Sequence, residues 1–92
     1  MRLDKFLKVS RIIKRRTVAN DACTGGRVSI NGRVAKPGAD VKIGDTLEIR
    51  FGSHVGMYRV VSVQEHARKE DAQTLYEVLR ENPEVAAKRA EE

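Results

Sequence analysis

Apolar side chains near the start of the chain recur at every third or fourth position, which is the spacing of one helix face. The pattern spans residues 3–13 and consists of Leu3, Phe6, Leu7 and Ile13, with the small polar Ser10 on the same face and Val9 and Ile12 widening it. A second helix is predicted over residues 18–24, with Thr17 as its N-cap and an apolar stripe of Val18, Ala19, Ala22 and Cys23. Gly25-Gly26 ends it, because glycine readily adopts the left-handed conformation that closes helices.

Alternating polar and apolar residues farther along the chain predict strands. Two such runs, residues 27–30 and 33–36, are separated by Asn31-Gly32, a strong hairpin signal because both turn residues need a positive φ. Pro37-Gly38 breaks the second run. A third strand is predicted over residues 46–51, and a fourth over about residues 58–63, after a glycine-containing loop at 52–56.

The last periodic segment predicts a C-terminal helix over about residues 70–81, stopped by Asn82-Pro83. One face of it would carry Ala72, Leu75, Tyr76 and Leu79. The expected fold is therefore of the α+β class: two N-terminal helices pack on a small antiparallel sheet, made of the hairpin and two further strands, with a C-terminal helix. We expect a single domain with residues 1–52 as its core, 53–83 as an extension and 84–92 as a frayed tail.

Positive charge is concentrated in the first half of this 92-residue chain. Residues 1–52 contain twelve Lys and Arg against five Asp and Glu, whereas residues 53–92 carry a net charge of −2. Such a polarised field attracts polyanions through counterion release and long-range steering. Charge placement thus favours a nucleic-acid partner over an acidic protein, a membrane surface or a merely solvated helix face.

Several other classes do not fit the sequence. A chain this short has little room for the deep pocket of most enzymes, and its apolar runs are too short to span a membrane. One cysteine and two histidines do not make a zinc or iron–sulfur site, and neither His54 nor His66 has a catalytic partner in the sequence. We expect a cytoplasmic protein that is not an enzyme and that has no metal, no cofactor and no secretory signal.

Nucleic-acid recognition by this chain is expected to depend on backbone shape and phosphates. Exposed aromatic residues that could stack on bases are scarce, because Phe6 and Phe51 stand at core-facing positions. Arginine forks can bind phosphates bidentately, and Asp4 is expected to cap the first helix or to orient a neighbouring arginine. Three of the candidates have structural alternatives. Thr17 could donate its hydroxyl to the nucleic acid or only cap the second helix. Lys36 could bind nucleic acid or only protect an exposed strand edge, and Asn31 could serve only to form the turn. The predicted nucleic-acid-binding residues are Arg2, Lys14, Arg15, Arg16, Thr17 and Lys36, with Asp4 as an orienting group and Lys8, Arg11 and Asn31 as weaker candidates.

Five short motifs in order resemble the RNA-binding domain named after ribosomal small-subunit protein four, the S4 domain. They are Arg2-Leu3-Asp4-Lys5-Phe6-Leu7, Lys14-Arg15-Arg16-Thr17, Gly26-Arg27-Val28-Ser29-Ile30-Asn31-Gly32, Lys36-Pro37 and Gly44-Asp45. The resemblance covers residues 1–52 and implies two helices followed by a small sheet, in agreement with the hydrophobic pattern.

The rest of the chain resembles the stand-alone members of this family, namely the ribosome-associated heat-shock protein and its short relatives in ribosome-associated quality control. That resemblance implies contact with large-subunit rRNA and the peptidyl-site tRNA on stalled large ribosomal subunits. We expect the protein to act as a monomer. It further implies support for C-terminal alanine tailing by a tRNA-recruiting tailing factor.

Two other functions stay open at this point. One is a general or small-subunit rRNA-binding assembly factor. The other is a protein-interaction domain whose main surface is the slightly acidic C-terminal helix.

Overall fold

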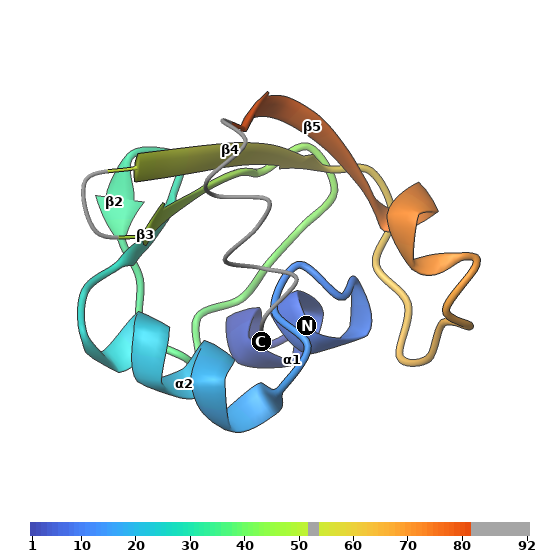
Figure 1. Cartoon of the computed structure of the whole chain (residues 1–92), viewed down its shortest axis with the longest axis horizontal. Helices are drawn as coiled ribbons and strands as arrows, with labels where there is room; N and C mark the ends of the chain where they lie inside the picture. The colour runs from blue at the N-terminus through green and yellow to red at the C-terminus, as the bar shows by residue number, and fades with distance from the viewer. Residues whose placement is uncertain (52–53, 82–92) are drawn as a thin grey trace.

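Two short helices lie on one face of a five-stranded antiparallel sheet in the computed structural model (Figure 1). The structure describes residues 1–51 and 54–81, apart from the side chains of Phe51 and His54. The elements in chain order are α1 (Leu3–Val9), α2 (Arg16–Thr24), β1 (Val28–Ile30), β2 (Arg33–Val34), β3 (Thr46–Phe51), β4 (His54–Val60), the 3₁₀ helix η1 (Ala72–Leu75) and β5 (Tyr76–Glu81). The predicted pair of helices on an antiparallel sheet is confirmed.

The strands lie side by side in the order β2-β1-β3-β4-β5. The predicted Asn31-Gly32 turn joins β1 to β2, with φ of 51° and 84° at its two residues. The Asn31 side chain also accepts the Thr46 N–H at 2.9 Å and donates to Asp45 at 3.0 Å, which ties the turn to the start of β3. These bonds favour the structural role of Asn31 over an RNA contact.

The core fills the space between the helices and the sheet. Its largest fully buried side chains include Phe6, Leu7 and Ile13 from the first segment, and Leu47 and Tyr58 from the sheet. Burial of an aliphatic or aromatic side chain contributes about 1.5–3 kcal/mol, so this layer stabilises the fold. The stripe predicted for the second helix is buried at Ala19, Ala22 and Cys23 and half-buried at Val18.

Helix α1 is shorter than the predicted helix over residues 3–13. Arg11 has a φ of 61°, the left-handed conformation that ends a helix, and the Ile13 N–H then bonds the Leu7 carbonyl at 3.0 Å. The buried Ser10 hydroxyl donates to the Leu7 carbonyl and accepts from the Ile12 N–H. Ile12 and Ile13 remain fully buried, so the apolar pattern identified core residues but placed the helix end wrongly.

The start of the second helix also differs from the prediction. Helix α2 begins at Arg16, and Arg15 is its N-cap without a side-chain cap hydrogen bond. Its first internal bond, from the Ala19 N–H to the Arg15 carbonyl, already places Thr17 inside the helix. Thr17 therefore does not cap the helix.

The predicted C-terminal helix over residues 70–81 is wrong. Ala72 and Leu75 form one buried turn of 3₁₀ helix, and the chain then continues as β5, which pairs with β4. The rings of Tyr76 and Tyr58 meet edge to face with centroids 5.6 Å apart, a contact that favours the strand. Pairing with the free edge of β4 outweighed the helical spacing of this segment. Residues 82–92, with the predicted stop at Asn82-Pro83 and the predicted frayed tail, lie outside the described residues.

Two predicted strands also differ from the structure by two or more residues at an end. Strand β2 covers only Arg33–Val34 instead of residues 33–36, and β4 covers His54–Val60 instead of about 58–63. The pairing of Phe51 with His54 explains the second difference, because it brings the return strand forward into part of the predicted loop.

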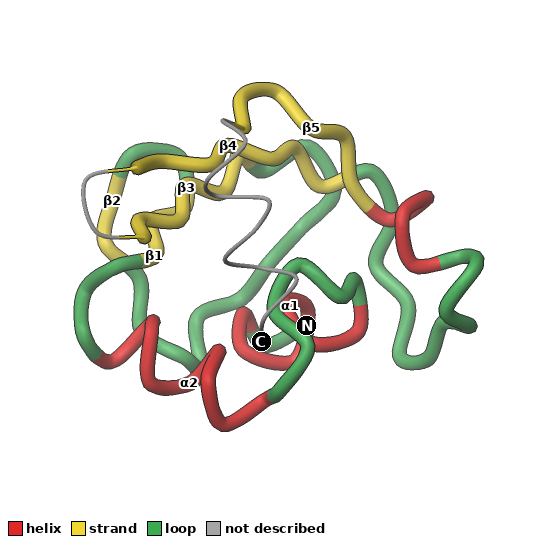
Figure 2. The backbone as a smooth tube through the Cα atoms, viewed as in Figure 1, coloured by secondary structure: helices red, strands yellow, loops and turns green. Residues whose placement is uncertain are grey.

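The connection between β2 and β3 runs beside the start of α1 (Figure 2). The Leu3 N–H donates to the Ala39 carbonyl at 2.8 Å and the Asp4 N–H to the Pro37 carbonyl at 3.1 Å. The Met1 amino group forms an ion pair with Asp40 at 2.8 Å, and Arg2 forms a β-bridge with the same residue. Arg2 is thereby held in extended conformation immediately before the helix. Nowhere in residues 1–51 and 54–81 is a helix long and apolar enough to cross a membrane.

Candidate nucleic-acid interface

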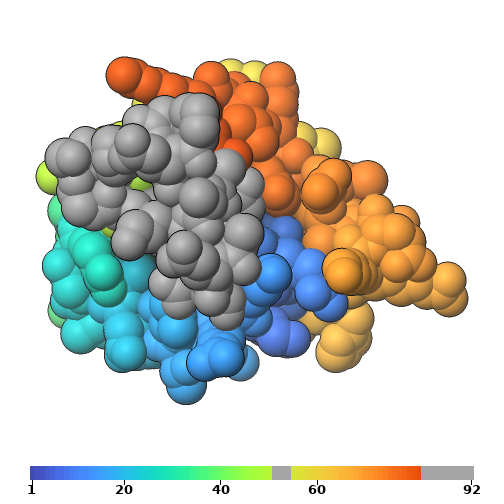
Figure 3. All heavy atoms as spheres, viewed as in Figure 1, coloured from blue at the N-terminus to red at the C-terminus, as the bar shows by residue number. Residues whose placement is uncertain are grey.

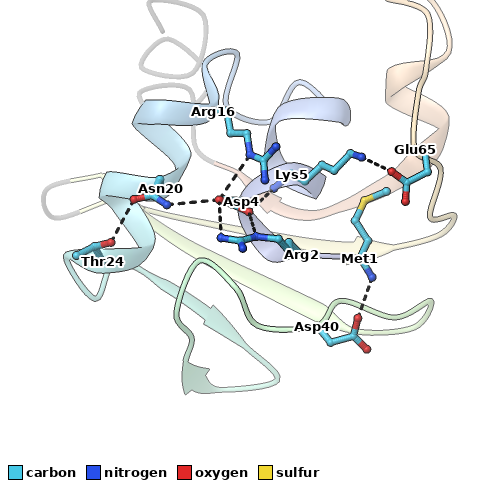
Figure 4. Close-up of polar contacts among 9 residues, drawn as sticks. All are labelled: Met1, Arg2, Asp4, Lys5, Arg16, Asn20, Thr24, Asp40 and Glu65. Carbon is cyan, nitrogen blue, oxygen red and sulfur yellow. Dashed lines mark hydrogen bonds and ion pairs between the residues drawn. The ribbon is translucent and has the colours of Figure 1, made fainter.

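A buried carboxylate joins two arginines that come from different helical segments (Figure 4). Asp4 in α1 accepts from Arg2 through both its oxygens, with Nε at 3.2 Å and the terminal nitrogen Nη2 at 3.4 Å. The Nε atom of Arg16, at the start of α2, lies 3.6 Å from Oδ2. The Asp4 side chain is 3% exposed, whereas those of Arg2 and Arg16 are 56% and 49% exposed. The carboxylate therefore holds two accessible guanidinium groups side by side.

Two neutral donors complete the Asp4 site. The backbone N–H of Lys5 donates to Oδ1 at 2.8 Å, which satisfies one of the free amides at the start of α1. The Asn20 side chain donates to Oδ2 at 3.4 Å and accepts from the Thr24 hydroxyl at 3.5 Å. The sequence predicted that Asp4 would cap the first helix or orient a neighbouring arginine. Arg2 is the N-cap residue of α1 and Asp4 lies inside the first turn, so Asp4 does not cap the helix. Its contacts with Arg2 and Arg16 agree with the orienting role, which stays a prediction.

Opposing effects act on the pKa of Asp4. Burial raises it, but hydrogen bonds from Arg2 and Asn20 and the charges of Arg16 and Arg2 outweigh burial and lower it below 3.8. Asp4 is consequently ionised at neutral pH and supplies a full negative charge between the arginines.

A basic hollow of about 310 Å³ lies on one side of Arg16. The residues that line it are Lys5, Lys8, Val9, Arg11, Lys14, Arg16, Glu65, His66 and Ala67. The left-handed turn at Arg11 closes α1 and returns the chain toward α2, which explains how bases at positions 8–16 surround one space.

A wider groove of about 780 Å³ adjoins Arg2, between α2 and the β1–β2 hairpin. Its apolar lining includes Ile30, Val34 and Pro37, and Arg2, Arg33 and Lys36 supply cations. Val34 is 68% exposed there. The groove thus combines apolar surface with positive charge.

Most of the predicted site residues come together around these features. Arg2 and Arg16 share Asp4, Arg16 lines the basic hollow with Lys8, Arg11 and Lys14, and Arg2 lines the groove with Lys36. Thr17 lies with Asp4, Arg16 and Asn20 around a smaller depression. Arg15 is exposed but lines neither the hollow nor the groove.

Sequence reasoning missed several members of the site. Asn20 stands four positions after Arg16 on α2, a spacing that signals a shared helix face. Lys5 and Glu65 form an ion pair between α1 and the segment after β4. No short-range signal could have found that pair, because its members are 60 positions apart.

Helix α1, helix α2 and the hairpin with its basic residues together define an S4 domain, and the model of the S4 domain family matches residues 1–47. The chain is also similar to curated proteins over most of its length. It is 58% identical to the "RQC P-site tRNA stabilizing factor" of Halalkalibacterium halodurans, over 90% of this chain and 94% of that relative. Identity to the factor of the same name from Bacillus subtilis is 51%, over 88% and 94%. The chain therefore belongs to the family of RQC P-site tRNA stabilizing factors, and the predicted family resemblance is confirmed.

A solved structure has the same fold. The trimeric structure of Vibrio cholerae heat shock protein 15 matches with a TM-score of 0.76 and 34% identity, covering 99% of this chain and 90% of that one. This similarity to a solved structure also supports the predicted α+β fold class.

Proposed function

We propose that this protein binds peptidyl-site tRNA and large-subunit rRNA on large ribosomal subunits that carry a stalled nascent chain. The arginine pair held by Asp4 carries the proposal, since it presents two fixed, accessible forks of the kind that bind phosphates bidentately. The shared designation of the relatives, RQC P-site tRNA stabilizing factor, supports this assignment.

The proposed mechanism is preorganisation. Without Asp4, the charges of Arg2 and Arg16 would repel each other and both side chains would sample many rotamers. With Asp4 buried between them, part of the ordering cost is met before RNA arrives, so more of the contact energy appears as affinity. Lys14, Lys8 and Arg11 on one side and Lys36 on the other extend the same positive surface.

The protein acts in this proposal as a monomeric binding factor in the cytoplasm, without catalysis. Holding the tRNA in the peptidyl site keeps the nascent chain in position, and a tRNA-recruiting tailing factor can then extend it with C-terminal alanine. Recognition would rest on phosphate geometry, with the apolar part of the Arg2 groove against sugar or base edges.

Cosedimentation tests the proposal directly. Purified protein is mixed with small subunits, with empty large subunits and with large subunits that carry peptidyl-tRNA, and each mixture is pelleted. We expect enrichment on the tRNA-bearing large subunits, and loss of that enrichment in Arg2→Ala and Arg16→Ala. Equal binding to all three particles, or enrichment on small subunits, would favour a general or small-subunit assembly factor instead.

The protein-interaction alternative can be tested in the same experiment. Its proposed helix over residues 70–81 is replaced by η1 and the edge strand β5. The side chains of Val78 and Leu79 on β5 are 49% and 40% exposed, so the double variant Val78→Thr/Leu79→Thr removes apolar surface while keeping residues that favour a strand. Undiminished ribosome binding by this variant would leave β5 without a primary role in association.

A further inference from the structure

The basic hollow has an unusual charge balance. Five cationic side chains line it, from Lys5, Lys8, Arg11, Lys14 and Arg16, and the one carboxylate in its described lining is Glu65. Like charges gathered in one concave space favour an anion among them. The hollow is about ten times larger than the ~30 Å³ that one water molecule occupies in the liquid, so a phosphate group fits.

The carboxylate of Glu65 comes from a distant part of the chain. It lies in the segment between β4 and η1 and accepts a hydrogen bond from the Lys5 ammonium (Figure 4). In Figure 3 this orange segment lies directly beside the blue atoms of the N-terminal segment. The Glu65 side chain is 68% exposed, and ion pairs at such exposure are weak and easily exchanged.

The backbone supplies a second, independent observation. Arg11 lines the hollow and is held at a φ of 61°, a conformation that glycine or asparagine adopts at lower cost. Residues held in unfavourable backbone conformations concentrate at functional sites. Glycine or asparagine would adopt this backbone conformation at lower cost, but neither would supply a cationic side chain to the hollow.

We propose that the basic hollow is a second binding site for an RNA phosphate, next to the arginine pair that Asp4 holds and sharing Arg16 with it, and that Glu65 is a built-in counter-anion that the phosphate displaces from Lys5. The inference rests on the proposed function, since it assigns a further contact of the same RNA-binding surface. Before binding, Glu65 neutralises Lys5 and lowers the attraction for polyanions. On binding, the phosphate takes over the ammonium and Glu65 moves into solvent.

A set of charge-matched variants tests the displacement. Glu65→Gln frees Lys5, whereas the control Glu77→Gln removes a carboxylate on β5 that is 57% exposed, pairs with Arg59 and does not line the hollow. Binding of a short fluorescein-labelled RNA stem-loop is measured by anisotropy at low salt. We expect Glu65→Gln to raise affinity by about three- to fivefold, as for removal of one competing charge, and Glu77→Gln by less than about 1.5-fold.

The Lys5→Gln variant tests whether the effect of Glu65 acts through Lys5. In its background, Glu65→Gln should give no more gain than Glu77→Gln, because the cation that Glu65 guards is gone. Equal gains from Glu65→Gln and Glu77→Gln in the parent protein would show a net-charge effect and overturn the proposal. So would unchanged or weaker RNA binding by Glu65→Gln, which is expected if the pair only fastens the segment to α1. A gain for a poly-glutamate peptide and not for RNA would also overturn it.

Arg11→Gly separates binding from folding, because glycine fits the backbone while the cation is lost. We expect an unchanged or higher melting temperature together with about three- to tenfold weaker RNA binding. Unchanged RNA binding in this variant would contradict the assigned site. The proposed function is judged separately, by binding of the parent protein to large subunits that carry peptidyl-tRNA. Failure there, with the Glu65 effect intact on free RNA, would remove the ribosomal role and leave the phosphate site.

Discussion

The carboxylate of Asp4 and the guanidinium of Arg16 lie 3.6 Å apart, although one belongs to α1 and the other to α2. The same carboxylate holds Arg2 at 3.2 Å, so one buried charge sets the positions of two exposed ones. If the two arginines bind RNA as proposed, substitution of Asp4 is expected to change both RNA affinity and fold stability, and the two effects can be measured separately.

Arg2→Ala and Arg16→Ala are each expected to weaken binding of the RNA stem-loop by about tenfold and to lower the log–log salt slope by about one, since each removes one phosphate contact. Arg50→Ala is the control, because Arg50 pairs with Glu48 on β3 and lines neither the basic hollow nor the groove. Anisotropy titrations across a salt series check this. An unchanged slope in both variants would contradict a phosphate role for the pair.

Asp4→Asn is expected to weaken RNA binding even though it makes the protein more positive. Loss of the anion frees Arg2 and Arg16 from their shared position, so the ordering cost returns at binding. A control for net charge is Asp71→Asn, an exposed carboxylate just before η1 for which steering alone predicts slightly tighter binding. Opposite signs for the two variants are the expected result, and tighter binding by both would remove the preorganising role of Asp4.

Acid stability should depend on Asp4. Its folded-state pKa lies below the ordinary aspartate value of 3.8, so the free energy that its ionised form contributes to folding is fully present above about pH 4 and is lost as the pH falls through the folded pKa. Because both arginines are half exposed, we expect Asp4→Asn to cost only about 1–2 kcal/mol at pH 7. Urea unfolding from pH 7 to pH 3 should show this difference shrinking at the acid end. A difference that stays constant with pH would contradict the assignment.

Cys23 should be protected against alkylation in the folded protein. Burial and the nearby charge of Asp4 raise the pKa of its thiol to about 11, against a slightly opposing backbone hydrogen bond. Since the unperturbed value is 9.0, the thiolate fraction at pH 8 falls by about a hundredfold. Iodoacetamide labelling followed by mass spectrometry checks this, with urea-unfolded protein as the reference. Equal rates in both states would show that the thiol is accessible.

Gly56→Ala should destabilise the sheet. A Cβ at this position would meet the Tyr58 hydroxyl oxygen at 2.5 Å, and the buried Tyr58 ring is held by Tyr76 and by a hydrogen bond to Glu81. Displacing the ring is expected to cost about 1–3 kcal/mol. Gly38→Ala is the matched control, because its nearest new contact is at 3.9 Å. Thermal unfolding of the two variants measures the difference, and equal melting temperatures would contradict the packing argument.

Local sequence pattern predicted the parts of the fold that local physics controls. The Asn31-Gly32 turn was found because positive φ restricts the residue choice, and α1 and α2 were found because their apolar faces have helical spacing. The end of α1 was missed because Arg11 carries no sequence signal for a left-handed conformation. Strand β5 was missed because the spacing of the buried residues Ala72 and Leu75 fits a long α-helix as well as one 3₁₀ turn followed by a strand. Pairing with the edge of β4 favours the strand, and that pairing cannot be read from the local sequence.

The same division applies to the candidate site. Charged residues near the predicted helix starts led to the choice of Arg2, Asp4 and Arg16 as candidates. These three residues are in contact in the structure. Glu65 and the Lys5 ion pair depend on how the segment after β4 packs against α1. Long-range packing of that kind leaves no periodicity in the sequence.

The central position of β3 limits how this domain can be divided. Strand β3 bonds β1 on one side and β4 on the other, and the part matched by the S4 family ends within it, at residue 47. A fragment truncated after β3 would expose the edge of β3 that bonds β4. It would also lose the buried side chains of Tyr58, Val60 and Leu75, which pack in the core. Such a minimal fragment would be prone to self-association, so grafting this RNA-binding unit onto another protein requires the whole five-stranded sheet.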